Sequence, residues 1–167
     1  MKIANDILIP ELARLVSEQK EVRFTPSGVS MRPFIEGDRD SVVLAALTHD
    51  PKRGDILLAK VQVAAVNCQL SIVNCQLPTT YVLHRLIRIE QNEQQTRYVL
   101  QGDGNLCGEE VCNREQIIAR VIRIERPNGH RKPLTRGRLW YTLKPMRRWL
   151  LKIYRHTVIP VYRYTEK

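Results

Sequence analysis

Ser30 lies in a stretch that could present a nucleophilic hydroxyl. It follows Pro26-Ser27-Gly28, which predicts a turn, and precedes Met31 and Pro33, which restrict the backbone after it. A serine hydroxyl is a weak nucleophile, so it needs a base within about 3 Å, a group that orients the base, and donors for the oxyanion. We expect Gly28 and Met31 to shape the oxyanion and substrate side of the turn, with the Ser30 amide as one donor.

His84 is the best candidate for the base. It lies in an apolar, branched and aromatic stretch at 80–90, which predicts a strand that would hold an imidazole rigidly. With a period of two, His84 shares a face with Val82 and Leu86 and should project among apolar neighbours. The remaining histidines lie in a polar loop and in the tail: His49, His130 and His156.

Asp103 could orient the imidazole as the third member of a triad. It follows the predicted strand at 97–101, which pairs naturally with the strand that carries His84. The same residue types also fit an alternative without catalysis, in which His84 is a core histidine and Asp103 only forms a turn. The pattern of residue types alone leaves both interpretations open.

Five short motifs in this chain resemble, in order, the conserved boxes of type I signal peptidases and the related self-cleaving repressors. The resemblance covers about residues 22 to 125. The motifs are Gly28-x-Ser30-Met31-x-Pro33, Gly37-Asp38, Gly54-Asp55-Ile56, His84-Arg85 and Gly102-Asp103-Gly104-Asn105. Five motifs in the same order are far more specific than any one of them.

The resemblance implies a serine peptidase of the Ser-His branch, which includes the endoplasmic-reticulum-like members. Ser30 would be the nucleophile and His84 the base, in the position that holds lysine in most bacterial members. Asp103 would orient His84, while Glu109 and Glu110 stay open, because Gly108-Glu109 stands in place of the Asp pair of that branch and Glu110 follows it. No metal or organic cofactor is implied, and small residues before the cleavage site are expected.

Two departures from the family pattern limit what the resemblance implies. Gly28 stands where signal peptidases commonly place a hydroxyl, and loss of one oxyanion donor costs on the order of 3 kcal/mol in the transition state. The chain also has no N-terminal run long enough for the membrane anchor of that family. We therefore expect a cytoplasmic or membrane-associated peptide as substrate, rather than a secreted preprotein.

The elements expected around these residues predict one mainly β domain. A helix is predicted over 6–18, and the predicted strands are short and separated by Gly/Asp turns. They cover 22–24, 41–47, 56–63, 80–90, 97–101 and 117–125. This pattern is typical of a compact antiparallel β barrel or sandwich of the signal-peptidase type, with a short N-terminal helix and a C-terminal basic amphipathic helix. We expect the β peptidase domain at 1–129 and a helical tail at 130–167.

The charge is concentrated in the tail. Residues 130–167 hold 11 of the 27 Lys and Arg but one of the 17 Asp and Glu, which accounts for the whole net charge of +10. A basic amphipathic helix is predicted at 138–155, with Trp140 and Trp149 beside its apolar face. It would either pack on the β domain or bind an anionic membrane surface. We expect a cytoplasmic protein, at most peripheral on the inner face of the membrane, and no nucleic-acid partner.

Two further features carry no chemistry in our interpretation. The four cysteines, at 68, 75, 107 and 112, fit no common zinc spacing and are expected to be reduced thiols. The segment 66–77 repeats Val-Asn-Cys-Gln-Leu with a seven-residue period, and two copies are too few for a solenoid. We interpret it as a duplicated insertion in a strand or hairpin.

Two rival functions remain open. A self-cleaving, repressor-like regulator shares the resemblance, although the leading helix is too short for a DNA-binding domain and such proteins generally use lysine as base. A non-catalytic peptide-binding domain on the same fold would explain the departures. The substrate and the oligomeric state do not follow from the sequence.

Overall fold

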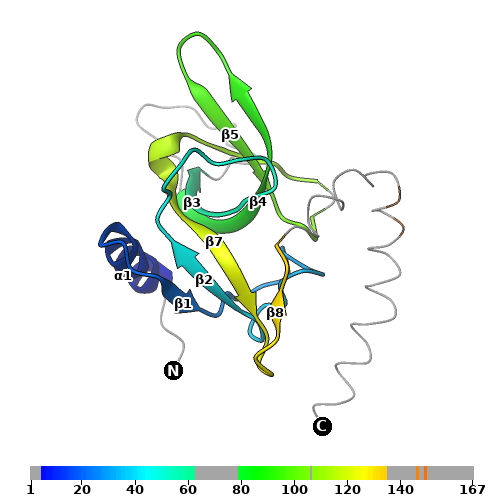
Figure 1. The fold of residues 1–167 in the computed structure, drawn as a ribbon. Helices are drawn as coiled ribbons and strands as arrows, with labels where there is room; N and C mark the ends of the chain where they lie inside the picture. Colours follow the sequence, from blue (N-terminus) through cyan, green and yellow to red (C-terminus); the bar gives the residue numbers. More distant parts are fainter. Residues whose placement is uncertain (1–4, 63–78, 106, 135–145, 147–148, 150–167) are drawn as a thin grey trace, which may run out of the picture.

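The computed structural model describes residues 5–62, 79–105, 107–134, 146 and 149 (Figure 1). The elements run from an N-terminal helix through eight strands and a short 3-10 helix. They are α1 (Asn5–Ser17), β1 (Val22–Phe24), β2 (Ser41–Ala45), β3 (Ile56–Gln62), β4 (Thr79–Gln91), β5 (Thr96–Gln101), β6 (Glu110–Cys112), η1 (Arg114–Gln116), β7 (Ile117–Glu125) and β8 (Arg131–Lys132).

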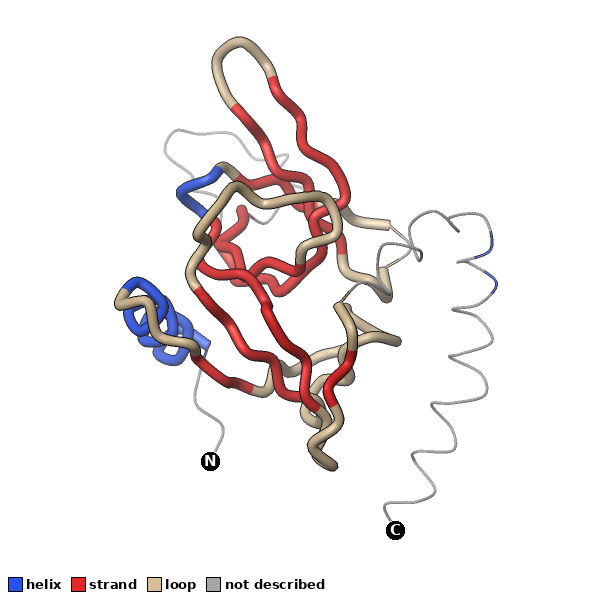
Figure 2. Tube along the Cα trace, viewed as in Figure 1, coloured by secondary structure: helices blue, strands red, loops and turns tan. Residues whose placement is uncertain are grey.

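The strands form one antiparallel sheet in the order β1-β2-β7-β3-β4-β5-β6, with β8 paired to β7. The sheet curls strongly around β3 and β4 (Figure 2). Within the described residues the strand pairs form an open path that begins at β1 and ends at β6. The prediction of a mainly antiparallel β domain is therefore confirmed, but the sheet is not closed into a barrel.

Most predicted elements are present with bounds close to those expected. Helix α1 matches the prediction at 6–18, and β1 and β7 match their predicted ranges. Two short strands, β6 and β8, were not predicted. Because β8 pairs with β7, the sheet continues to Lys132, beyond the predicted domain boundary at residue 129.

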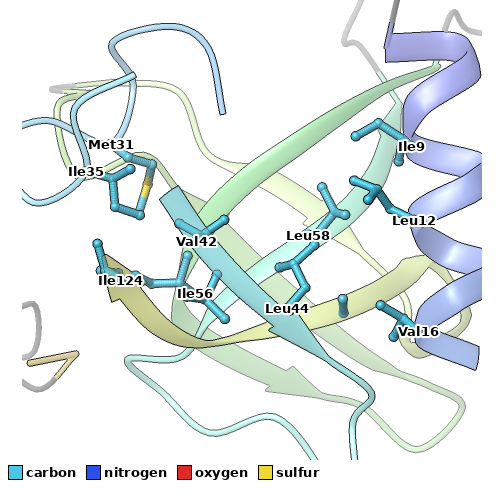
Figure 3. Close-up of a cluster of buried hydrophobic side chains, with 12 residues drawn as sticks. Ile9, Leu12, Val16, Met31, Ile35, Val42, Leu44, Ile56, Leu58 and Ile124 are labelled. Carbon is cyan, nitrogen blue, oxygen red and sulfur yellow. The ribbon is translucent and has the colours of Figure 1, made fainter. Parts of the chain in front are cut away.

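Two clusters of buried side chains support the sheet. The first cluster joins the apolar face of α1 to β2, β3 and β7 and includes Met31 and Ile35 (Figure 3). These two side chains anchor the segment after Ser30 in the core. The second cluster lies within the curl and contains residues of β3 to β7, among them Leu57, Leu86 and Leu100.

Strand β4 passes between the two clusters, so its alternate side chains enter different cores. Tyr81 and Leu83 pack against the first cluster, whereas Val82 and Leu86 belong to the second. His84 is buried and follows the same alternation as Val82 and Leu86. The predicted position of His84 among apolar neighbours is thus confirmed.

A buried ionic contact fastens the chain after the Ser30 turn to β8. The Asp40 side chain is inaccessible to solvent and accepts hydrogen bonds from Arg39, from the Glu36 amide at 3.1 Å and from Lys132 Nζ at 3.0 Å. Burial alone would raise the pKa of Asp40, but these hydrogen bonds outweigh it and lower the pKa to about 2. Asp40 is therefore a charged structural residue at neutral pH.

Two predicted features fall outside the described part of the chain: the repeat at 66–77, and the tail helix apart from two of its residues. Met146 and Trp149 are described, are helical, and are 50% and 64% exposed. In the part of the chain that the structure describes, no helix has the length and apolar character needed to cross a bilayer.

Candidate active site

The Ser30 turn is built on a close approach between two glycines. Gly28 has a φ of +94°, which favours glycine, and a Cβ on Gly37 would lie 2.1 Å from the Gly28 carbonyl oxygen. The Asp38 amide donates a hydrogen bond to the Pro26 carbonyl at 2.8 Å. The first two motifs therefore form one compact loop that fixes the backbone around Ser30.

The motif at 102–105 supports this loop from the other side. The Gly104 amide donates a hydrogen bond to the Ser30 carbonyl at 2.7 Å, and a Cβ on Gly102 would lie 2.5 Å from the same oxygen. A side chain at Gly102 would thus displace the Ser30 turn. These glycines are needed because two backbone segments touch here.

Asp103 forms a buried ion pair with Arg85. Its two carboxylate oxygens accept hydrogen bonds from Arg85 Nε at 2.9 Å and Nη2 at 2.7 Å, and both side chains are almost inaccessible to solvent. Arg85 Nη1 also donates to the Gly54 carbonyl at 2.8 Å, and its guanidinium lies 5.7 Å from the centre of the Phe34 ring. Arg85 therefore connects three separate segments.

These contacts join all five sequence motifs into one unit. Gly37 lies against Gly28, Gly104 holds the Ser30 carbonyl, and Arg85 binds both Asp103 and the Gly54 carbonyl. Neither the composition of the chain nor the order of the motifs along it required the five motifs to meet in space. Each Gly-Asp motif contributes backbone packing or a structural charge.

Glu110 is the carboxylate that binds the imidazole of His84. The distance from Glu110 Oε2 to His84 Nδ1 is 2.9 Å, and the histidine side chain is 6% exposed against 24% for the glutamate. Glu110 is the first residue of β6, a strand that pairs with β5. The prediction that Asp103 orients His84 is corrected here, because both Asp103 oxygens bind Arg85.

The side chain of Glu109, the other acid that the sequence left open, binds an arginine and not His84. It pairs with Arg88 at 2.9 Å on the exposed side of the sheet. Glu109 precedes β6, whereas Glu110 is the first residue of that strand, and the two adjacent acids bind different partners. The structure thus separates three acids that the sequence could not distinguish.

Ser30 and His84 line the same pocket, which has a volume of about 140 Å³. Gly28 and Met31 also line it, as predicted for the turn, whereas Asp103 is not part of its wall. Within the described residues the Ser30 hydroxyl makes no hydrogen bond, so the two side chains share the pocket without a direct bond. Hydrogen bonds of this kind often form only when substrate is bound.

One edge of β4 borders the pocket. Residues 79–85 pair with β3, but pairing with β5 begins only at Arg85. Among the described strands, the second edge of 79–84 therefore has no partner, and Tyr81, Val82 and Leu83 of this edge line the pocket. An extended chain could pair with such an edge.

The remaining candidate groups have other roles. His49 contacts Arg120 and Thr48 on the surface. Cys107 is exposed and Cys112 is buried, and burial raises the pKa of the Cys112 thiol to about 11. No group of three or more metal-binding side chains occurs within the described ranges.

Comparisons with protein-family models, with curated proteins and with solved structures found no match for this chain.

Proposed function

We propose that this protein is a serine endopeptidase of the signal-peptidase type, with Ser30 as nucleophile, His84 as general base and Glu110 as the residue that positions the base. The observation that carries the proposal is the joint position of Ser30 and His84 in one pocket, with the Glu110 carboxylate 2.9 Å from Nδ1 of the imidazole. This arrangement provides the nucleophile, base and positioning acid that acyl transfer needs.

The proposed reaction proceeds through an acyl-enzyme. Ser30 Oγ attacks the scissile carbonyl carbon while its proton passes to His84 Nε2. The imidazole can accept at Nε2 because Nδ1–H donates to Glu110, which also stabilises the imidazolium. His84 then gives the proton to the leaving amine, and the carbon–nitrogen bond breaks. In the second half-reaction water attacks the ester carbon while His84 Nε2 takes a proton from it. The ester C–O bond then breaks, the carboxylic acid product leaves, and His84 gives the proton to Ser30 Oγ.

The Ser30 amide is the proposed oxyanion donor. Among the described residues it has no hydrogen-bond acceptor, although its carbonyl is held by Gly104. A donor that is fixed in direction and unpaired before substrate binds can bond a developing oxyanion without reorganisation. Gly28 supplies no side-chain donor at the position where signal peptidases commonly have one.

The proposed substrate is a peptide or protein segment in extended conformation. The unpaired edge of residues 79–84 would add the segment as a further strand, as in β-augmentation, and bring its scissile bond to Ser30. A pocket of about 140 Å³ suits a small side chain next to that bond. This agrees with the small residues that the resemblance implies.

We also propose that the tail holds the enzyme at the cytoplasmic face of an anionic membrane. The exposure of Met146 and Trp149 supports this, because these apolar side chains are not covered by the β domain. Flotation with anionic and neutral vesicles over a salt series tests it. Equal flotation with both vesicle types would contradict it.

A fluorophosphonate probe tests the peptidase proposal directly. The wild type should be labelled, with the adduct on the Ser30 peptide by mass spectrometry, whereas Ser30→Ala should not be labelled. Ser27→Ala is the matched control, because Ser27 lines the same pocket and should not be the attachment site. Wild type that does not react, or Ser30→Ala that reacts equally, would reject the proposal.

A non-catalytic peptide-binding domain is the second candidate. The absence of a Ser30–His84 hydrogen bond within the described residues favours it. Peptides that bind wild type and Ser30→Ala equally, without any turnover or labelling, would establish this candidate.

A further inference from the structure

A second pocket lies apart from the candidate active site and shares none of its lining residues. It has a volume of about 180 Å³ and is bordered by three cationic side chains, Arg85, Arg126 and Lys132. Apolar side chains form the rest of the wall, principally Phe34, Ile124 and Leu134. The pocket thus combines positive charge with an apolar surface, and no carboxylate side chain is among the lining residues that the structure describes.

Two of the three cations are neutralised by buried acids behind the pocket wall. Arg85 binds Asp103, and Lys132 binds Asp40 at 3.0 Å. Arg126 is different, because its guanidinium has no hydrogen-bond or ionic partner among the described residues. The pocket therefore has one uncompensated positive charge at its rim.

Lys132 also lies close enough to two arginines for their charges to act on its pKa. Burial is the main effect that lowers the pKa of Lys132, and the nearby charges of Arg126 and Arg39 lower it further, against the opposing effect of Asp40. An anion bound beside Arg126 and Lys132 would relieve this repulsion. Such charge-assisted bonds are stronger than neutral ones.

We propose that this pocket binds an anion carried at the end of a short apolar chain, with a carboxylate or phosphate as the anionic group. The anionic oxygens would bond Arg126 and Lys132 at the rim, and the chain would lie against Phe34, Ile124 and Leu134. An apolar cavity of roughly 150 Å³ holds a benzene-sized group, so this volume suits about six carbon atoms. The ligand is either a free amphiphile or the exposed part of an acidic lipid.

Hexanoate is a suitable probe because it has both a carboxylate and a six-carbon chain. Acetate has the carboxylate without the chain, and hexanol has the chain without the charge. We expect hexanoate to cause saturable shifts in the backbone amide NMR signals of Phe34 and Leu134 in the full chain. Acetate and hexanol should bind at least about tenfold more weakly. Absence of saturable shifts with hexanoate, or equal binding of hexanol, would overturn the proposal.

Arg126→Gln should weaken hexanoate binding by about tenfold or more, because it removes the unpaired cation. Arg131→Gln is the matched control. Arg131 lies in the same hairpin and carries the same charge, and its guanidinium has no hydrogen-bond or ionic partner among the described residues, but it does not line the pocket. Both positions are exposed, so both variants should fold, which their thermal unfolding would check. Equal affinity in the two variants would refute the role of the pocket.

Vesicles separate the two sources of the ligand. If an acidic lipid is the source, Arg126→Gln should float with phosphatidylglycerol vesicles less than Arg131→Gln does. If the two variants float equally while only Arg126→Gln loses hexanoate binding, the ligand is a free amphiphile. The test does not depend on catalysis, so the pocket and the proposed peptidase activity can fail separately.

Discussion

Asp103→Asn should destabilise the protein strongly, because it leaves the charge of Arg85 buried without its partner. Removal of one member of a buried ion pair costs about 3–5 kcal/mol. Arg85 is 1% exposed, which favours this range, but it keeps its bond to the Gly54 carbonyl and asparagine still offers one acceptor oxygen. We therefore expect a loss of about 3 kcal/mol, a large part of the roughly 5–15 kcal/mol that stabilises a typical domain.

Urea unfolding followed by far-UV circular dichroism measures this loss. With a slope of about 2 kcal/mol/M, the midpoint should fall by about 1.5 M. Glu109→Gln is the matched control, because Glu109 makes the same kind of bond to an arginine but on the exposed side of the sheet. Exposed pairs contribute about 0–1 kcal/mol, so its midpoint should move by less than about 0.5 M.

Equal midpoints for Asp103→Asn and Glu109→Gln would refute the structural role of the buried pair. The double variant Arg85→Met/Asp103→Leu gives a second check, since it removes both charges. Its loss of stability should be smaller than the sum of the two single losses. Strict additivity would show that the two side chains do not interact.

Rates of fluorophosphonate labelling then distinguish the role of Glu110 from that of Asp103. Glu110→Gln should lose only about 1 kcal/mol of stability, as for one hydrogen bond, but should react with fluorophosphonate about 10²–10⁴-fold more slowly. The folded fraction of Asp103→Asn keeps the bond between His84 and Glu110 and should react much faster than Glu110→Gln. The opposite order, measured in fully folded protein, would restore Asp103 as the residue that positions His84.

Three further predictions test other parts of the structure. Burial raises the pKa of Asp40, but its hydrogen bonds hold that pKa at about 2, below the usual 3.8. The stability that Asp40 contributes, on the order of 2 kcal/mol, should be present above about pH 4 and be lost as the pH falls towards 2. In Asp40→Asn the free energy of unfolding should depend less on pH over this range. An unchanged pH dependence in this variant would contradict the prediction. Iodoacetamide should modify the exposed Cys107 of the native protein well before the buried Cys112, which peptide mapping would detect. The reason is that only the thiolate reacts and burial raises the pKa of Cys112 to about 11. Equal rates of modification would show that β6 opens readily. Gly37→Ala should lower the melting temperature by several degrees and abolish labelling, because its Cβ would lie 2.1 Å from a backbone oxygen of the nucleophile turn; Gly129→Ala, which has open space and only a φ of +77° to strain it, should cost about 1–2 kcal/mol and label normally.

The sequence predicted the helix and the longer strands because each has a clear periodic pattern. The alternation along β4 was sufficient to place His84 beside Val82 and Leu86 in the second core. The sequence did not predict β6 or β8, which have three and two residues. Neither strand shows the apolar alternation that marks Val22 and Phe24 in the equally short β1. Both form because a neighbouring strand already presents an edge.

The error over the positioning acid has a related cause. Asp103 lies two residues after the end of β5, so its position in the sequence matched the resemblance. Nothing in the chain indicated that Arg85 would bind both of its oxygens. Glu110 approaches His84 only because β6 turns back and pairs with β5. The one available signal was the acidic pair at 109–110, and only the second member of that pair lies in β6.

The site can therefore be divided by what each motif contributes. The glycines and Asp103 bring backbone segments close together and hold the Ser30 turn through Gly104 and Arg85. Ser30 and His84 are the groups with direct access to the pocket. Substitution at the structural positions should reduce stability and labelling together, whereas substitution of Ser30, His84 or Glu110 should reduce labelling in a folded protein. A variant of Ser30 or His84 that unfolds the domain would mean that these residues, too, are only structural.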